Sequence, residues 1–250
     1  MKILKNEKIR GNVFLLIVED KKIASVAKPG QFVQVKLNAP SPFILRRPFS
    51  IHCVEESTFH ILYKVVGEGT KVLSTYNPDN EIDILGPLGN GFELNKDDTS
   101  NYYKNVLLVA GGIGIAPLYF VAKKIKESGG TVNTLIGAAN KSEILCKENF
   151  EKLGTVNTST EDGSDGIKGL VTDLLRGAPK PEIMFACGPA PMLKAIQSYA
   201  STHFIPCQLS LEQYMACGIG ICLGCAVPIK NGYKYVCKDG PVFWSDEVKL

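Results

Sequence analysis

The stretch NVLLVAGGIGIAP at residues 105–117 determines the fold class of this 250-residue chain. Residues 106–110 form an apolar run of strand length, and residues 117–126 after the glycines have the composition of a helix. A strand, a tight glycine loop and a helix in succession are typical of a doubly wound parallel sheet. Such a loop can present backbone N–H groups and a helix N-terminus to a phosphate.

The same loop also allows two other interpretations. It departs from the pattern G-x-G-x-x-G, because Pro117 stands where the third glycine would be, so it could be an ordinary tight turn. Residues 105–122 carry no charge and approach the length of a membrane span. The glycines and Pro117 in the middle of this stretch disfavour a spanning helix, and we expect no membrane segment.

Strand and helix patterns keep alternating after this first unit. We expect strands at residues 132–136, 156–158 and 183–186, and helices at residues 141–153, 170–176 and 191–199. This alternation predicts a parallel sheet with helices on both faces. We assign residues 99–206 to this α/β nucleotide-binding domain.

A second loop, Cys187-Gly188-Pro189, follows the strand expected at residues 183–186. Parallel strands place their carboxyl ends at one edge of the sheet, where ligands bind in open sheets, so this loop should lie near Gly112 and Gly114. Two loops at one edge favour a bound nucleotide. Taken alone, Cys187 would be an ordinary small buried residue.

Residues 1–98 have the pattern of a small antiparallel β-barrel or sandwich. Val33, Val35 and Leu37 are apolar, whereas Gln34 and Lys36 between them are polar. Further strands are expected at residues 12–18 and 58–66, a short helix after Gly69-Thr70, a turn-rich exit at residues 86–91 and a linker at residues 95–101.

The segment RRPFSI at residues 46–51 ends one extended stretch of this domain. Arginine can grip a phosphate with two hydrogen bonds, an aromatic side chain packs against a ring, and serine offers a hydroxyl group. The segment therefore predicts contact with a phosphorylated heterocycle. An ordinary strand start with exposed arginines is the alternative.

The C-terminal segment, residues 207–250, has the spacing of an iron–sulfur site. Four of the eight cysteines follow the pattern C-x4-C-x2-C-x11-C, and they are Cys217, Cys222, Cys225 and Cys237. The first three match the plant-type spacing of a 2Fe-2S cluster. Interspersed glycines allow the backbone to wrap closely around such a cluster and to direct N–H groups at its sulfurs. A zinc site and four unligated thiols are the alternatives.

Charge and composition exclude several other classes of function. The net charge is +3 and no block of lysine or arginine with interleaved aromatics is present, so we expect no nucleic-acid partner. Charged residues appear too early in residues 1–7 for a secretory signal, so we expect a cytoplasmic protein. His52, His60 and His203 are dispersed, and we expect no acid–base catalytic constellation.

The order of these motifs resembles the ferredoxin-NADP reductase superfamily. With the cysteine loop at the C-terminal end, the chain is more closely similar to the electron transfer subunits of dihydroorotate dehydrogenase B. The resemblance implies an N-terminal FAD-binding β-barrel, an NAD-binding α/β domain and a C-terminal 2Fe-2S loop. It implies FAD contacts from Arg47, Pro48, Phe49, Ser50, Leu62, Tyr63, Lys64, Gly69 and Thr70.

For the nicotinamide cofactor, the resemblance implies contacts from Gly112, Gly114, Pro117, Cys187, Gly188 and Pro189. It also implies NAD rather than NADP. The residues support this choice weakly, because residues 137–140 after the second strand of the α/β domain contain neither the acidic residue that grips a ribose nor an arginine for a 2'-phosphate.

The resemblance further implies a partner, an FMN-containing catalytic subunit that oxidises dihydroorotate, in a heterotetramer with two copies of each subunit. Electrons would pass from its FMN through the cluster and FAD to NAD+. We expect the apolar side chains Ile219, Ile221 and Leu223 to contribute to docking, with ordinary packing as the alternative.

Two other functions fit the same motifs. One is the small subunit of an NADPH-ferredoxin oxidoreductase or a sulfide dehydrogenase, whose relatives can replace one cluster cysteine, whereas all four are present here. The other is a non-catalytic zinc-binding adaptor that has kept a reductase fold.

Overall fold

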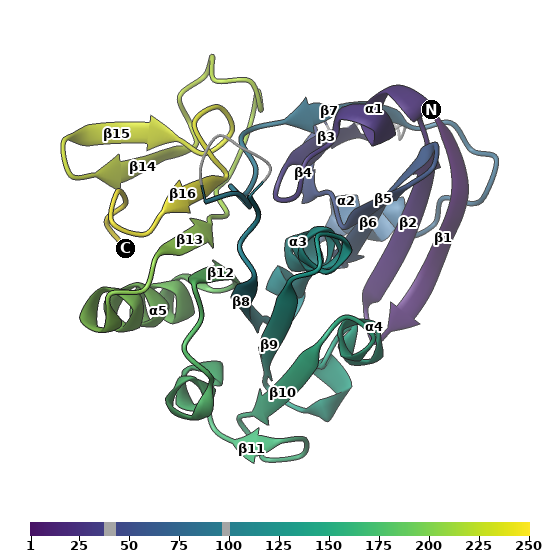
Figure 1. Cartoon of the computed structure of the whole chain (residues 1–250). Coiled ribbons are helices and arrows are strands. Elements are labelled where there is room, and N and C mark those ends of the chain that lie inside the picture. The colour runs from purple at the N-terminus through teal and green to yellow at the C-terminus, as the bar shows by residue number, and fades with distance from the viewer. Residues whose placement is uncertain (38–43, 97–100) are drawn as a thin grey trace.

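In this computed structural model, residues 1–37, 44–96 and 101–250 are described. Two antiparallel sheets form the N-terminal part, a parallel sheet with helices forms the middle, and a small hairpin lies near the C-terminus (Figure 1). The predicted combination of an antiparallel barrel with a doubly wound α/β domain is confirmed.

The N-terminal sheets enclose one apolar core. Their strands are β1 (Lys2–Arg10), β2 (Val13–Glu19), β3 (Phe32–Lys36), β4 (Arg47–Ser50), β5 (Cys53–Glu55), β6 (Thr58–Lys64) and β7 (Asp83–Leu88), and the helices are α1 (Lys21–Val26) and α2 (Glu68–Leu73). The strand orders are β1-β2-β6-β5 and β4-β3-β7. Leu16 from the first sheet and Val35 from the second are fully buried in the shared core.

The middle of the molecule is a seven-stranded sheet. Its strands are β8 (Asn105–Gly111), β9 (Thr131–Ala138), β10 (Thr155–Thr160), β11 (Ile167–Lys168), β12 (Ile183–Cys187), β13 (Cys207–Ser210) and β16 (Val242–Trp244). The order is β11-β10-β9-β8-β12-β13-β16, and only the β13–β16 pair is antiparallel. The strand order reverses direction between β8 and β12, which is where ligands bind in such sheets.

Helices cover both faces of this sheet (Figure 1). They are α3 (Ile115–Glu127), α4 (Lys147–Glu151) and α5 (Ala190–His203), with 3-10 turns η1 (Gly112–Gly114), η2 (Lys141–Glu143) and η3 (Val171–Gly177). Leu108 of β8 packs in the core that contains α3, whereas Leu107 packs in the core that contains α5. Side chains of β8 therefore alternate between two buried faces.

One expected helix is interrupted. Residues 141–153 were predicted as a single helix, but they form η2 and α4 instead. Cys146 between them has a left-handed backbone, with φ at +57°, which no continuous right-handed helix can contain.

The expected linker at residues 95–101 lies partly outside the described residues, since residues 97–100 are not described. Its two ends run antiparallel, because Lys96 N donates to Asn101 O at 2.9 Å. The parallel sheet of the α/β domain also includes β13 and β16, which follow residue 206. The boundaries proposed for the three domains stay a prediction. Among the described helices, none has the length and apolar character needed to cross a membrane.

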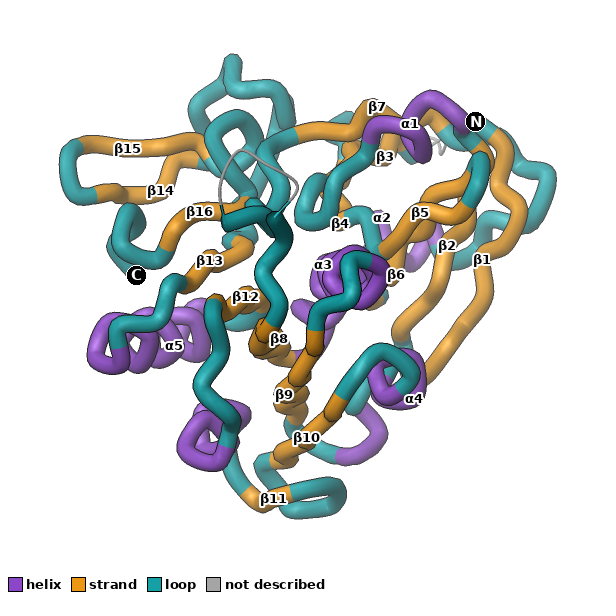
Figure 2. Tube along the Cα trace, viewed as in Figure 1, coloured by secondary structure: helices purple, strands orange, loops and turns teal. Residues whose placement is uncertain are grey.

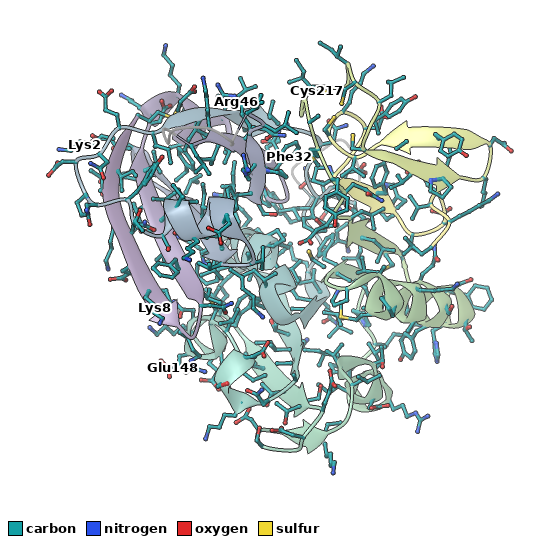
Figure 3. All side chains as sticks on the ribbon, turned by 180° about the vertical axis from the view of Figure 1, so that it is seen from behind. Lys2, Lys8, Phe32, Arg46, Glu148 and Cys217 are labelled. Carbon is teal, nitrogen blue, oxygen red and sulfur yellow. The ribbon has the colours of Figure 1, made fainter. Side chains whose placement is uncertain are left out.

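The C-terminal segment holds the cysteine loop and a hairpin of β14 (Ala226–Ile229) and β15 (Gly232–Tyr235). Between β13 and β14 the chain is loop throughout (Figure 2). Figure 3 shows Cys217 of this loop at the same end of the molecule as Arg46 and Phe32 of the barrel. The cysteine loop therefore lies beside the barrel.

Candidate functional site

A cavity of about 450 Å³ lies between the barrel and the α/β domain. Eight of the nine residues expected to contact FAD line it, namely Arg47, Pro48, Phe49, Ser50, Leu62, Tyr63, Lys64 and Thr70. They come from β4, β6 and α2. Ile113 of η1 and Ala116 and Pro117 of α3 line it from the α/β domain. The structure therefore brings this predicted set together around one cavity.

The ninth residue, Gly69, lies against Arg47. A Cβ atom at Gly69 would be 2.8 Å from Arg47 Nε, so a larger residue would displace the guanidinium group. Thr70 fixes the start of α2, because its Oγ1 accepts hydrogen bonds from Val66 N at 2.9 Å and Gly67 N at 3.1 Å. These contacts hold the barrel side of the cavity in place.

The neighbouring arginines have different environments. Arg46 makes two hydrogen bonds to Asp83, at 2.9 Å and 2.7 Å, and this guanidinium group holds the pKa of Asp83 below its usual value. Arg47 lines the cavity, and Arg46 is not among the residues that line it. Of the two arginines, Arg47 is the one placed to bind an anion.

A second cavity, of about 580 Å³, lies at the carboxyl edge of the parallel sheet. Gly112, Gly114, Gly188 and Pro189 line it. The two loops touch, because a Cβ atom at Gly114 would overlap the Cys187 carbonyl group. Their predicted meeting at one edge is confirmed, and only a glycine at position 114 permits so close an approach.

Two residues of the predicted nicotinamide set lie elsewhere. Pro117 lines the first cavity, between the barrel and the α/β domain. Cys187 is 2% exposed and is not among the residues that line either cavity. Burial raises the pKa of its thiol to about 12, so it stays protonated. At the sheet edge, Cys187 presents its backbone carbonyl group, which packs against Gly114.

The two cavities adjoin. Lys64, Ile113 and Glu212 line both of them. Lys64 Nζ lies 3.3 Å from Glu143 Oε2, so this ion pair joins β6 of the barrel to the α/β domain. Groups bound in the two cavities would therefore meet beside these side chains.

Three carboxylates of the second cavity were missed in the sequence. Glu143, Glu161 and Glu212 all line it. Glu161 and Glu212 follow the carboxyl ends of β10 and β13, so the rule that ligands bind at that edge would have found both. Glu212 is exposed as a residue. The protein atoms around its carboxyl group nevertheless keep water away from it, and this desolvation raises its pKa.

The cysteine loop directs backbone N–H groups at sulfur atoms. Cys217 Sγ accepts from Ile221 N at 3.3 Å and from Cys222 N at 3.4 Å. These N–H groups, that of Cys222 first, lower the pKa of the Cys217 thiol to about 6. Gly220 N donates to Cys237 Sγ at 3.1 Å. Such donors stabilise negatively charged sulfur ligands.

The four thiols lie in two pairs. The Sγ atoms of Cys225 and Cys237 are 3.2 Å apart, and the Cys222 side chain hydrogen-bonds to Cys217. Within the described part of the chain, no three cysteine, histidine or acidic side chains converge as they would around one metal ion. Two pairs of thiols suit a two-iron cluster, whereas zinc needs four ligands around one centre.

The three histidines lie apart from these features. His52 is buried, and its Nδ1 donates to the Ala116 carbonyl oxygen at 2.8 Å. His60 of β6 contacts Cys53 Sγ at 3.2 Å, and His203 ends α5 on the surface. None of the three lines the two cavities among the described residues.

Comparison with protein families gives two matches. Residues 212–249 match the family model of the iron–sulfur cluster binding domain of dihydroorotate dehydrogenase B. Residues 108–198 match that of the oxidoreductase NAD-binding domain. The first contains the four cysteines, and the second contains both loops at the sheet edge.

Among solved structures, the chain is similar to one from a study of flavin-based electron bifurcation by the NADH-dependent reduced ferredoxin-NADP oxidoreductase. The TM-score is 0.87 and the identity 36%, over 99% of this chain and 89% of that one. It also shares the fold of a flavohemoglobin from Malassezia yamatoensis, with a TM-score of 0.67 and 17% identity over 82% of this chain and 56% of that one.

Two curated relatives carry the name dihydroorotate dehydrogenase B (NAD(+)), electron transfer subunit. The relative from Caldanaerobacter subterraneus is 43% identical over 99% of this chain and 96% of its own length. The relative from Listeria innocua is 39% identical over 100% of this chain and 98% of its own length. The chain therefore belongs to the family of electron transfer subunits of dihydroorotate dehydrogenase B.

Proposed function

We propose that this chain transfers electrons from the FMN of a dihydroorotate dehydrogenase catalytic subunit, through a 2Fe-2S cluster and FAD, to NAD+. The observation that carries the proposal is the adjacency of three binding features: the barrel cavity adjoins the sheet-edge cavity, and residues 210–215, which lead into the cysteine loop, line the barrel cavity. When bound, the cluster supplies one-electron transfer and the flavin converts single electrons into a hydride. The protein supplies position and environment.

FAD fits the cavity between the barrel and the α/β domain. Arg47 can form two hydrogen bonds to the pyrophosphate, and the Ser50 hydroxyl group can bond to the ring system. The Tyr63 hydroxyl group is already engaged, since it donates to Asn6 Oδ1 at 3.0 Å, so Tyr63 offers its ring. Polar groups from the barrel and apolar walls from both domains suit an amphipathic cofactor.

NAD fits the sheet-edge cavity. The glycine loop at the start of α3 offers backbone N–H groups to a pyrophosphate. Glu143, Glu161 and Glu212 give this cavity a negative lining that disfavours the additional phosphate of NADP. Lys64 offsets Glu143 through their ion pair. The lining thus favours NAD, and the nicotinamide would meet the flavin where the two cavities adjoin.

The cysteine loop would hold the cluster through Cys217, Cys222, Cys225 and Cys237, which already form two pairs. We further propose a heterotetramer with two copies of each subunit, supported by the family membership. A cytoplasmic location is part of the proposal. It agrees with eight free thiols, including two whose sulfur atoms are only 3.2 Å apart.

The test is to express the chain with its endogenous partner, purify the complex without air, and measure NAD+ reduction driven by dihydroorotate. We expect activity from the complex and none from the chain alone, which should still reduce an artificial dye with NADH. If the chain alone oxidised dihydroorotate as fast as the complex, the proposed division of labour between subunits would be wrong.

A second candidate is the small subunit of an NADH-dependent reduced ferredoxin-NADP oxidoreductase. The observation in its favour is the TM-score of 0.87 with 36% identity over nearly the whole chain. The same purification distinguishes the two functions. Dihydroorotate-dependent reduction of NAD+ supports the first, and NADH-dependent exchange between ferredoxin and NADP, without a response to dihydroorotate, supports the second.

A further inference from the structure

Gln34 is a buried amide without a full set of hydrogen bonds. It lies in β3 and is 0% exposed. Its Oε1 atom has no hydrogen-bond partner among the described residues. Its Nε2 atom donates to Met215 Sδ across 3.9 Å, and a thioether is a weak acceptor.

Another buried glutamine shows the usual arrangement. Gln208 is 1% exposed, and its Oε1 accepts from Glu93 N at 2.9 Å while its Nε2 donates to Glu93 O at 3.0 Å. Buried side-chain amides are paired in this way because burial without partners is unfavourable. Gln34 lacks such pairing: its NH2 group, with two N–H donors and one weak acceptor among the described residues, can donate to an acceptor in the cofactor-loaded protein.

The surroundings of Gln34 identify that partner. Gly218 directly follows Cys217, and a Cβ atom there would lie 2.7 Å from Gln34 Cγ and 2.9 Å from Gln34 Cδ. Position 218 must thus be glycine for the cysteine loop to pack on the amide, and its φ of +71° also favours glycine. The Gln34 side chain lies directly against the loop of the proposed iron–sulfur site.

Two other neighbours of Gln34 line the flavin cavity. Pro48, its partner in the β3–β4 pairing, lines that cavity, and so does Met215. The amide therefore lies between the proposed flavin site and the cysteine loop. Among the described residues the NH2 group has only the weak acceptor Met215 Sδ, so it can turn toward a sulfur atom without losing a strong hydrogen bond.

We propose that Gln34 is a positioning residue of the iron–sulfur site, which donates a side-chain N–H group to a sulfur atom of the bound cluster and raises its reduction potential. The inference rests on the proposed function, because it requires a cluster on the four cysteines. A hydrogen bond to sulfur stabilises the reduced, more negative cluster, and such bonds are among the factors that set its potential.

The test is a redox titration of the complete, cofactor-loaded protein, monitored by the electron paramagnetic resonance signal of the reduced cluster. In Gln34→Leu we expect full iron content and a lower potential. The potential should fall by about 59 mV, which for a one-electron couple corresponds to a tenfold change in the equilibrium constant for electron transfer. Gln34→Glu keeps the shape but loses the donor, so its potential should also fall.

Gln208→Leu is the matched control. It removes two hydrogen bonds from a buried glutamine that makes no described contact with the cysteine loop, so it should lower thermal stability and leave the cluster potential unchanged. Unchanged potentials and spectra in both Gln34 variants, at normal iron content, would overturn the inference. A wild-type protein without iron would instead refute the proposed function itself, so the two failures are distinguishable.

Discussion

The Sγ atoms of Cys225 and Cys237 lie 3.2 Å apart, although the two residues are twelve positions apart in the sequence. The hairpin of β14 and β15 brings them together, since it begins directly after Cys225 and ends two residues before Cys237. Burial and the nearby Cys225 raise the pKa of Cys237 to about 12. Because a metal ligand must be a thiolate, a metal ion that binds this pair would displace the protons of both thiols.

Replacement of Cys225 by serine should abolish cluster binding and spare the flavin. The flavin cavity receives no residue from the hairpin, so FAD should stay bound. Iron and acid-labile sulfide analysis, together with visible absorbance, measures the result. Cys146→Ser is the control, because Cys146 precedes α4, away from the cysteine loop, and its iron content should equal that of the wild type. Full iron in Cys225→Ser would contradict the assignment.

Arg47 and Arg46 should differ in their effect on FAD affinity. Arg47→Ala removes charge-assisted hydrogen bonds worth about 1.5–3 kcal/mol, so FAD affinity should fall roughly 10- to 150-fold. Arg46→Ala should leave it nearly unchanged, because Arg46 is paired with Asp83. Equilibrium titration of the FAD-free protein measures both. Equal losses in the two variants would show that Arg47 does not hold the cofactor.

Much of the fold was predictable from local patterns, and the unit from β8 to α3 is the clearest case. Its apolar run is buried on both faces, and its glycines are required where two loops meet. Gln34 shows the limit of such patterns. Alternation in residues 33–37 groups it with Lys36 as a polar position, yet Gln34 is fully buried and Lys36 is exposed. The cysteine loop covers it, and that contact is invisible in a strand pattern.

Glu143 was likewise beyond local patterns, whereas Glu161 directly follows β10 and could be placed at the sheet edge from its position alone. Glu161 lies in a loop that folds back on β10, because Asp165 Oδ2 accepts from Thr158 Oγ1 at 2.7 Å and pairs with Lys147 Nζ at 3.0 Å. Glu143 lies in η2 and lines the cavity beside Lys64 of β6, with which it forms an ion pair. The placement of Glu143 depends on this contact, which joins residues 79 positions apart in the sequence.

The docking prediction concerns the apolar side chains beside the cysteines. Ile221 is 73% exposed, and Ile219 and Leu223 are about half exposed. If the partner covers Ile221, Ile221→Glu removes burial worth about 1.5–3 kcal/mol, so partner affinity should fall roughly 10- to 150-fold. Iron content and dye reduction by NADH should persist.

The control for docking is Ile167→Glu. Ile167 is also an exposed apolar residue, but it lies in β11 at the opposite edge of the large sheet (Figure 1). The Ile167→Glu variant should bind the partner subunit as tightly as the wild type does. Sedimentation of the two mixed subunits measures both variants, and unchanged assembly of Ile221→Glu would exclude this docking surface.

The stability of the protein should fall in mild acid because of His52. Burial lowers the pKa of His52 to about 4 from 6.5, so between these values the unfolded chain binds a proton that the folded chain does not. The free energy of unfolding should therefore decrease as the pH falls from 6.5 to about 4, by on the order of 3 kcal/mol. His60, whose pKa is also lowered by burial, adds in the same direction.

Replacement of His52 by glutamine should reduce this dependence. Denaturant unfolding of the two proteins across the same pH range measures it. The free energy of unfolding of the variant should change less with pH, and the change that remains should come from His60. Equal slopes would show that His52 is not the group responsible.

The central claim is that four thiolates hold two irons beside a flavin in one chain. Its most direct test is quantitative analysis of iron, acid-labile sulfide and FAD in the wild-type protein purified without air. We expect two irons, two sulfides and one FAD per chain, the composition of one 2Fe-2S cluster and one flavin. A colourless protein, or one with a single zinc ion in place of iron, would contradict the claim.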